Sequence, residues 1–275
     1  MKYSLTHCYT DHNKGDAAII VSTVQLIKEL DANAEINMFS TFGPTDDQFK
    51  KEHDFIKTFA SGLYPGLFYQ PRPLFSSSDA SRLLHFIWIS FKFSVLMLTK
   101  NRKILKLFFS KLEINGISKF MESDVILSKG GSYITTQNKS VRQSLSLITM
   151  LYPFLLAKRY KKKMYIFSQS LGPVIGAHNQ WLMKKALSGI EKIYLRESTC
   201  LERYNEVQDL KKMVPMVTSD VLKVFDLNYS INSKLNFAGP SLAPRPKGMR
   251  PYPALAVSFT PPLSGLMVLP NKAAY

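Results

Sequence analysis

Apolar and polar positions along the chain follow two regular patterns, which predict strands and helices in turn. Short runs rich in Val, Ile, Tyr or Phe are typical of buried parallel strands, and segments with apolar residues on one side predict the helices that follow. The predicted strands are 3–9, 35–40, 124–128, 164–169, 192–195 and 214–218, and the predicted helices are 16–30, 139–158, 178–188 and 198–207. This alternation predicts an α/β fold with a Rossmann-like parallel sheet. Only the segment 45–122 resists assignment from its pattern.

The pattern changes after Asp226. No acidic residue follows it, and eight of the 15 prolines lie between Pro240 and Pro270. Proline at this density interrupts helices and strands. We therefore predict a Rossmann-like domain over 1–228 and a proline-rich tail over 229–275. The tail is either flexible or the product of a shifted reading frame that replaced a second domain, and we favour the second explanation because the α/β order stops without a domain-like ending.

Composition narrows the class of protein. With 45% hydrophobic and 20% charged residues in a chain of 275, the sequence is typical of a globular protein. The two cysteines, Cys8 and Cys200, provide neither a disulfide framework nor a metal-ligand cluster, which favours a reduced, cytoplasmic setting. The first residues lack the apolar run of a signal peptide. The apolar stretch 83–98 contains Lys92 and is too short to cross a membrane.

The net charge of +16 is unevenly distributed. Between Ser81 and Leu112 there are seven Lys or Arg residues and no Asp or Glu, and 158–163 adds five more basic residues. Such clusters bind phosphates of nucleic acids, anionic lipids or lipid-linked sugars. No recognition helix, RNP-like stretch or zinc spacing is present, so we expect no nucleic-acid partner. The apolar and basic segment 83–111 either lies on an anionic membrane surface or forms a buried helix with a solvated basic side.

Two loops after predicted strands have compositions suited to binding. In a parallel sheet, ligands collect at the carboxyl ends of the strands. The candidate binding residues in these loops are Asn13, Gly15, Asp16, Gly130, Gly131 and Ser132. We expect Asp16 to cap the helix after the first loop, and the glycine pair to expose backbone N–H groups to an anion. The alternative for both loops is an ordinary turn.

Two further loops complete the series. Gln169, Ser170 and Gly172 follow the strand 164–169, and a polar pair before a rigid Gly-Pro turn can present side chains to a cleft. Arg196 ends the strand 192–195, just before a helix that we expect Ser198 to cap. Its guanidinium can pair with a phosphate or a carboxylate. The alternatives are a tight turn for the first loop and a structural salt bridge from Arg196 to Glu197 for the second.

Taken in order, these loops resemble those of the polysaccharide pyruvyl transferase family. The matching segments are Asn13-x-Gly15-Asp16, Asp124-Val-Ile-Leu-Ser-x-Gly130-Gly131-Ser132, Gln169-Ser-Leu-Gly172-Pro173, Arg196-Glu197-Ser198 and Ser219-Asp220, and the resemblance covers about 3–226. It implies the N-terminal half of a GT-B-like architecture, in which two Rossmann-like domains enclose the active site.

The resemblance implies an activity, transfer of a pyruvyl group from phosphoenolpyruvate to sugar hydroxyls of a cell-surface polysaccharide or its lipid-linked precursor. Phosphoenolpyruvate is the donor substrate, and no metal or other cofactor is implied. The reaction needs an anion site, for which we choose Arg196, and an acid or base, for which His178 and His12 are candidates beside the loops. His178 opens a helix whose dipole favours the neutral imidazole, although a surface histidine without a role is the alternative.

Other functions remain compatible with the same sequence. The family's second half contributes to the donor site, and 229–275 does not resemble it. The chain can therefore be inactive through truncation, as the non-catalytic product of a disrupted gene. The other alternative is a GT-B-type glycosyltransferase that uses a nucleotide-sugar donor.

Overall fold

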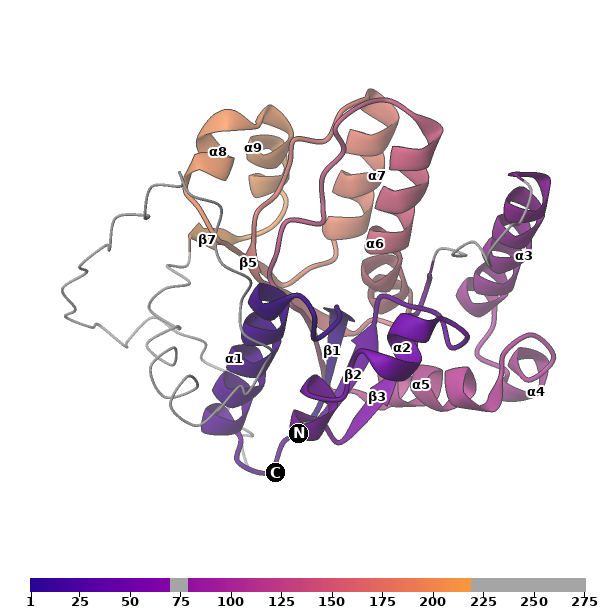
Figure 1. Ribbon diagram of the computed structural model, residues 1–275. Coiled ribbons are helices and arrows are strands. Elements are labelled where there is room, and N and C mark those ends of the chain that lie inside the picture. The colour runs from indigo at the N-terminus through magenta and orange to yellow at the C-terminus, as the bar shows by residue number, and fades with distance from the viewer. Residues whose placement is uncertain (70–78, 219–275) are drawn as a thin grey trace, which may run out of the picture. The chain divides into compact units, whose positions relative to one another are not determined.

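The computed structural model describes residues 1–69 and 79–218, which form a parallel sheet covered by helices (Figure 1). The strands of this part of the chain are β1 (Lys2–Cys8), β2 (Glu35–Ser40), β3 (Gly62–Tyr64), β4 (Val125–Ser128), β5 (Lys163–Gln169), β6 (Lys192–Leu195) and β7 (Met216–Thr218). They lie in the order β3-β2-β1-β4-β5-β6-β7, and every pairing is parallel. The predicted Rossmann-like α/β fold is confirmed. The predicted tail 229–275 and the Ser219-Asp220 pair lie outside the described residues.

The helices fill the connections between successive strands. They are α1 (Lys14–Leu30), α2 (Asp47–Lys51), the 3-10 helix η1 (Ile56–Phe59), α3 (Asp79–Leu98), α4 (Arg102–Leu105), α5 (Lys111–Glu122), α6 (Val141–Arg159), α7 (Ala177–Leu187), α8 (Thr199–Arg203) and α9 (Asn205–Lys211). The predicted helix 198–207 is two short helices that meet at Tyr204. The described part of the unassigned segment 45–122 contains a strand and five helical elements.

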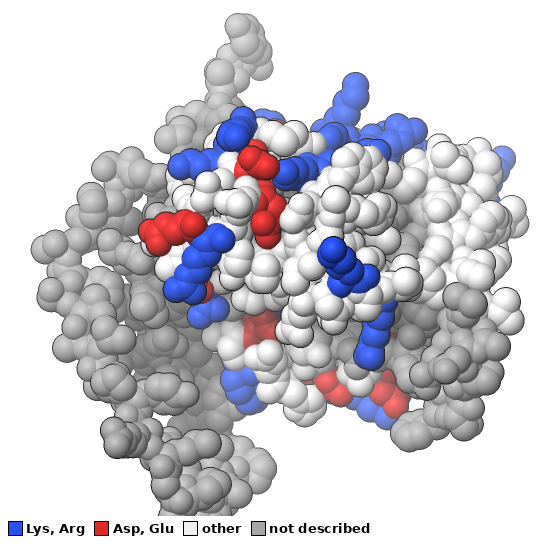
Figure 2. All heavy atoms as spheres, turned by 90° about the horizontal axis from the view of Figure 1, so that it is seen from above, with Lys and Arg blue, Asp and Glu red and all other residues white. Residues whose placement is uncertain are grey.

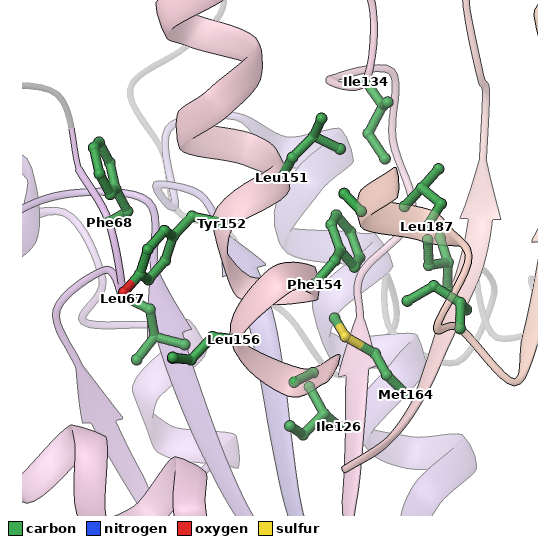
Figure 3. Packing of buried hydrophobic residues seen from close by; sticks show 14 of the residues in the cluster. Leu67, Phe68, Ile126, Ile134, Leu151, Tyr152, Phe154, Leu156, Met164 and Leu187 are labelled. Carbon is green, nitrogen blue, oxygen red and sulfur yellow. The ribbon is translucent and has the colours of Figure 1, made fainter. Parts of the chain in front are cut away.

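Side chains from the two faces of the sheet enter two separate apolar clusters. In β4, Val125 and Leu127 point to the face that α1 covers, whereas Ile126 points to the opposite face. This alternation is the two-residue repeat of a strand. Figure 3 shows Ile126 and Met164 of the sheet beside Phe154 of α6. The sheet is thus buried on both faces in its centre, as its continuous apolar strands require.

The helix α3 lies beside the sheet, and two tyrosine hydroxyls, from α6 and from the residue directly after it, donate hydrogen bonds to the backbone of α3. The Tyr152 hydroxyl donates to the carbonyl oxygen of Phe93 at 2.7 Å, and the Tyr160 hydroxyl donates to that of Leu96 at 2.7 Å. No helix in the described ranges is long and apolar enough to cross a membrane.

A buried ion pair joins α3 to α5. Lys92 donates to Glu113 Oε1 at 2.5 Å, and both side chains are almost completely buried. The Tyr69 hydroxyl donates to the same oxygen at 3.0 Å. Glu113 Oε2 accepts from the Ser110 backbone N–H at 2.8 Å and so closes a capping box at the start of α5. The lysine that interrupts the apolar segment therefore points inward, to the carboxylate of another helix.

Candidate functional site

The strand order reverses between β1 and β4, and we call the region outside the carboxyl ends of these two strands the crevice. The chain runs from β1 outward to β2 and β3, then returns to the other side of β1 as β4. The loops after β1 and β4 therefore lead away in opposite directions. In open parallel sheets, ligands bind at this reversal, outside the carboxyl ends of the strands. All four predicted loops lie at this edge because each follows the carboxyl end of a strand.

Asn13 caps the helix that begins at this crevice. Its Oδ1 accepts the backbone N–H of Asp16 at 3.2 Å, and its Nδ2 donates to Asp16 Oδ2 at 2.7 Å. The expectation that Asp16 is the cap is wrong. Asn13 has the extended backbone of a cap residue, whereas Asp16 is the third residue of the helix. The second carboxylate oxygen of Asp16 thus remains for another partner.

That partner is Lys129, the first residue after β4. Its ammonium donates to Asp16 Oδ1 and lies 5.9 Å from the centre of the Tyr133 ring. Lys129 is only 3% exposed. Lysine is almost never buried unless it is paired. A fixed cation therefore lies at the reversal of the sheet, beside the positive N-terminal end of α1.

The glycine pair after β4 allows this loop to approach β5. A Cβ on Gly130 would lie 2.6 Å from the carbonyl oxygen of Ser168, and Gly131 has a φ of +147°. Gly131 donates its N–H to Ser168 at 3.2 Å and accepts from Ser170 at 2.8 Å. The expectation that Gly131 exposes its N–H to an anion is wrong, because β5 takes that donor. Ser132 is exposed beside it.

The loops after β4 and β5 continue as one hydrogen-bonded ribbon beyond the sheet. Gly172 donates its N–H to Ile134 at 3.1 Å, and Thr136 donates its N–H to Pro173 at 2.9 Å. Figure 1 shows these two loops running side by side to the starts of α6 and α7. The ribbon forms one wall above the carboxyl edge of β4 and β5.

Gln169 lies at the base of this ribbon and is fully buried. Its Nε2 donates to the Ser170 carbonyl at 2.9 Å, but its Oε1 is buried without a hydrogen-bond partner among the described residues. An unpaired buried amide oxygen is uncommon in proteins and often indicates a water or ligand. The Ser170 hydroxyl donates to Glu197 Oε1 at 3.2 Å, which links this loop to the one after β6.

Arg196 lies exposed at the end of β6. Its backbone N–H donates to the Gln169 carbonyl at 3.1 Å. Among the described residues its guanidinium forms no ion pair, and the alternative of a salt bridge to Glu197 is not observed. The expected side-chain cap by Ser198 is also absent. Since β4 and β6 are two strand spacings apart, about 10 Å, Arg196 and Lys129 can address two anionic groups of one small ligand.

His178 is not part of this connected group of residues. It is the second residue of α7, is exposed, and stacks on Trp181 with 6.1 Å between ring centres. His12 is exposed in the loop after β1, directly before Asn13. Among the described residues, no group of three His, Cys, Asp or Glu side chains is arranged to hold a metal ion.

His7 is a buried residue of the site that the sequence did not distinguish. Nε2 donates to the Met150 carbonyl at 2.8 Å, so Nδ1 accepts from the Ser128 hydroxyl at 3.0 Å. The pKa of His7 is lowered to about 3, mainly because the side chain is buried. The hydrogen bond to Met150 raises this pKa in part, and the positive charge of Lys129 lowers it further. The neutral ring stacks on Tyr133, with 4.6 Å between ring centres. His7 therefore supports the crevice and does not exchange protons at neutral pH.

This burial predicts a pH-dependent stability. Above pH 6.5, the ordinary pKa of histidine, His7 is neutral in both the folded and the unfolded chain. Between pH 6.5 and about pH 3, only the unfolded chain takes up a proton at this residue. The free energy of unfolding is expected to fall from pH 6.5 toward pH 3, by on the order of 4 kcal/mol from this residue. Urea unfolding of the wild type and of His7→Asn at pH 7 and pH 4.5 measures the effect. Equal pH slopes for the two proteins would contradict it.

The fold defines a class, a Rossmann-like α/β protein, and a buried lysine–aspartate ion pair lies at the reversal of its strand order. Figure 2, which looks onto this edge, shows basic side chains more widely spread than acidic ones. The sequence model of the polysaccharide pyruvyl transferase family matches residues 13–221. The chain belongs to this family. No curated protein and no solved structure matches it.

Lys129 is a candidate site residue that the sequence pattern did not identify. A single lysine in a loop is usually exposed, and nothing in its type distinguishes it from the other basic residues. The available signal was its position, directly after a buried strand and before two glycines. Its pairing with Asp16 becomes visible only when the sheet places β1 beside β4.

Proposed function

We propose that the crevice binds phosphoenolpyruvate and that the protein transfers its pyruvyl group to sugar hydroxyls of a cell-surface polysaccharide or its lipid-linked precursor. The observation that carries this proposal is the buried ammonium of Lys129 at the reversal of the sheet, two strands away from Arg196, which has no ion-pair partner among the described residues. Phosphoenolpyruvate has two anionic groups, a carboxylate and a phosphate. The Lys129 ammonium and the exposed Arg196 guanidinium supply one cation for each of these groups.

In the proposed reaction the cations hold the donor and stabilise the leaving group. A first sugar hydroxyl adds to C2 of phosphoenolpyruvate while the methylene carbon takes up a proton. A second hydroxyl then displaces phosphate at C2, which gives the ketal and inorganic phosphate. Arg196 is the proposed anion clamp, and Lys129 is the second cation.

Residues around the crevice have supporting roles in this proposal. Those proposed to line the substrate site are Asn13, Gly15, Asp16, Gly130, Gly131, Ser132, Gln169, Ser170 and Gly172. For the proton transfers we retain His178, because its imidazole is exposed beside the loop after β5 and forms no hydrogen bond with the described residues. We place the reaction in the cytoplasm, a proposal supported by two buried cysteines that form no disulfide.

Donor binding separates this proposal from a glycosyltransferase. Phosphoenolpyruvate at a hundredfold excess over its Kd is expected to stabilise the protein by about 2.7 kcal/mol, a rise in Tm of about 5–10 °C. Thermal unfolding measures this rise, with pyruvate, inorganic phosphate and nucleotide sugars as comparisons. Stabilisation by a nucleotide sugar and none by phosphoenolpyruvate would favour the GT-B-type glycosyltransferase, whose fold also suits a nucleotide. If phosphoenolpyruvate binds but no phosphate is released in the presence of the acceptor, the protein is the non-catalytic product of a disrupted gene.

A further inference from the structure

The outer side of α3 exposes a row of large apolar side chains. The row consists of Leu84, Ile87, Trp88 and Phe91, which are 67%, 53%, 50% and 52% exposed. Residues at this spacing lie on one side of a helix. The opposite side of α3, with Phe93 among others, is buried against the core. We call the exposed row the outer stripe.

Aromatic contacts extend and fix the outer stripe. The ring of Phe108, which follows α4, lies 6.2 Å from that of Trp88 and 5.7 Å from that of Phe91. Leu107 beside it is 77% exposed. Figure 1 shows α3 at the outside of the molecule, on the side of the sheet that ends in β3. In Figure 2 the same side, on the right, is largely white. The rings of Trp88, Phe91 and Phe108 thus contact one another and form one apolar surface.

A group of cations adjoins the outer stripe. We call it the basic cluster, and its exposed members are Arg102, Lys103, Lys106 and Lys111. None of them forms an ion pair with the described residues, since the nearby carboxylate of Glu113 is taken by buried Lys92. The sequence supplies no Asp or Glu between 81 and 112. The surface is therefore apolar at its centre and positive at its border, and no carboxylate of the described residues pairs with the basic cluster.

The combination of exposed aromatic side chains and neighbouring cations favours an anionic bilayer as the partner of this surface. Indole and phenyl rings beside lysines are typical of helices that lie in the interface of a bilayer with anionic headgroups. A two-fold dimer through this side would place the basic cluster of one copy beside that of the other, which like charges disfavour. A neutral apolar partner would leave the cations without a counter-charge.

We propose that the outer stripe inserts into the headgroup region of a bilayer that contains anionic phospholipid, while the basic cluster contacts the lipid phosphates. The protein then binds the membrane peripherally through α3 and α4. The proposal does not depend on the proposed reaction, because it rests on residues outside the crevice. If both hold, docking brings the crevice to the surface where a lipid-linked acceptor lies.

The two tryptophans allow a direct test. Trp181→Phe leaves Trp88 as the single tryptophan, which can be excited selectively at roughly 295 nm or longer, beyond tyrosine absorption, and Trp88→Phe leaves Trp181, which is 54% exposed on α7. With vesicles containing phosphatidylglycerol, the emission of Trp88 is expected to shift to shorter wavelength and to be quenched by brominated lipid. The emission of Trp181 is expected to stay unchanged. Vesicles of phosphatidylcholine alone are the lipid control.

Variants of the full chain separate the contributions of charge and of apolar contacts to vesicle binding. Arg102→Gln, Lys103→Gln and Lys106→Gln together are expected to weaken vesicle binding about a hundredfold, at about fivefold per cation. Phe91→Ser in the Trp181→Phe background is expected to weaken it about tenfold. The matched control is Lys211→Gln, Lys212→Gln and Met213→Ser, three exposed residues beside β7, which should leave binding within about threefold. Far-UV circular dichroism confirms that each variant is folded.

Two results would overturn the proposal. One is co-sedimentation with anionic vesicles while Trp88 emission stays unchanged, because the basic residues beyond 226 can bind lipid by charge alone. The other is a concentration-dependent blue shift of Trp88 without lipid, accompanied by dimers in sedimentation velocity. That outcome would assign the outer stripe to a second copy of the chain.

Discussion

Replacing Lys129 by methionine is expected to weaken phosphoenolpyruvate binding by ten- to a hundredfold. Methionine retains most of the length and volume of the buried stem but removes the ammonium, and a hydrogen bond to a charged group contributes about 1.5–3 kcal/mol. The variant leaves Asp16 without its cation, so the remaining carboxylate also repels the donor. Isothermal titration calorimetry with phosphoenolpyruvate gives the affinity directly and does not require an acceptor sugar.

Lys139 provides the control for this result. It carries the same charge later in the same loop, but its side chain is exposed. Solvent screens an exposed charge, so Lys139→Met is expected to change the affinity by less than about threefold. Equal losses in the two variants would mean that the net charge of this edge attracts the donor, and the assignment of Lys129 would be wrong.

Glu113→Ala is expected to reduce the free energy of unfolding by about 3–5 kcal/mol. The substitution leaves the Lys92 ammonium buried without a counter-charge, and it also removes the cap of α5. Urea unfolding monitored by circular dichroism measures the loss. The control lies in the same helix, where exposed Glu122 pairs with Lys2 at 3.3 Å, and Glu122→Ala should cost less than about 1 kcal/mol.

A double variant distinguishes unpaired charge from lost packing. Lys92→Met with Glu113→Leu removes both charges and keeps the apolar volume, so it is expected to recover at least half of the stability lost in Glu113→Ala. If the double variant is as unstable as the single one, the cost comes from the lost cap and the lost Tyr69 contact rather than from the isolated ammonium.

The sheet could be predicted from the sequence because its strands are buried on both faces. The run 124–128 has three successive apolar residues, Val125 to Leu127, between polar residues, and the structure places β4 at Val125–Ser128. The segment 45–122 could not be predicted in the same way. In α3 the apolar residues surround the helix, so no one-sided pattern appears, and Lys92 interrupts them from the inside. Only the tertiary contact with Glu113 explains that lysine.

The candidate site could be predicted as a set of loops but not as a set of contacts. Strand-end composition selected Asn13, Gly130 and Gln169, and the sheet aligns their loops at one edge. Whether Asn13 or Asp16 caps the helix depends on the residue at which the helix begins. The predicted helix begins at residue 16, whereas α1 begins at Lys14, and this difference moves the cap to Asn13. Lys129 and His7 depend on the pairing of β1 with β4, which composition does not encode.

The ribbon formed by the loops after β4 and β5 has a consequence for binding. Its hydrogen bonds, from Gly131 to Ser168 and from Thr136 to Pro173, hold both loops in place without a ligand. The conformational entropy of these loops is lost during folding, so a donor that binds against them need not order them. For the proposed donor this wall would be a rigid template, and any adaptation to the donor would be left to the loops after β1 and β6.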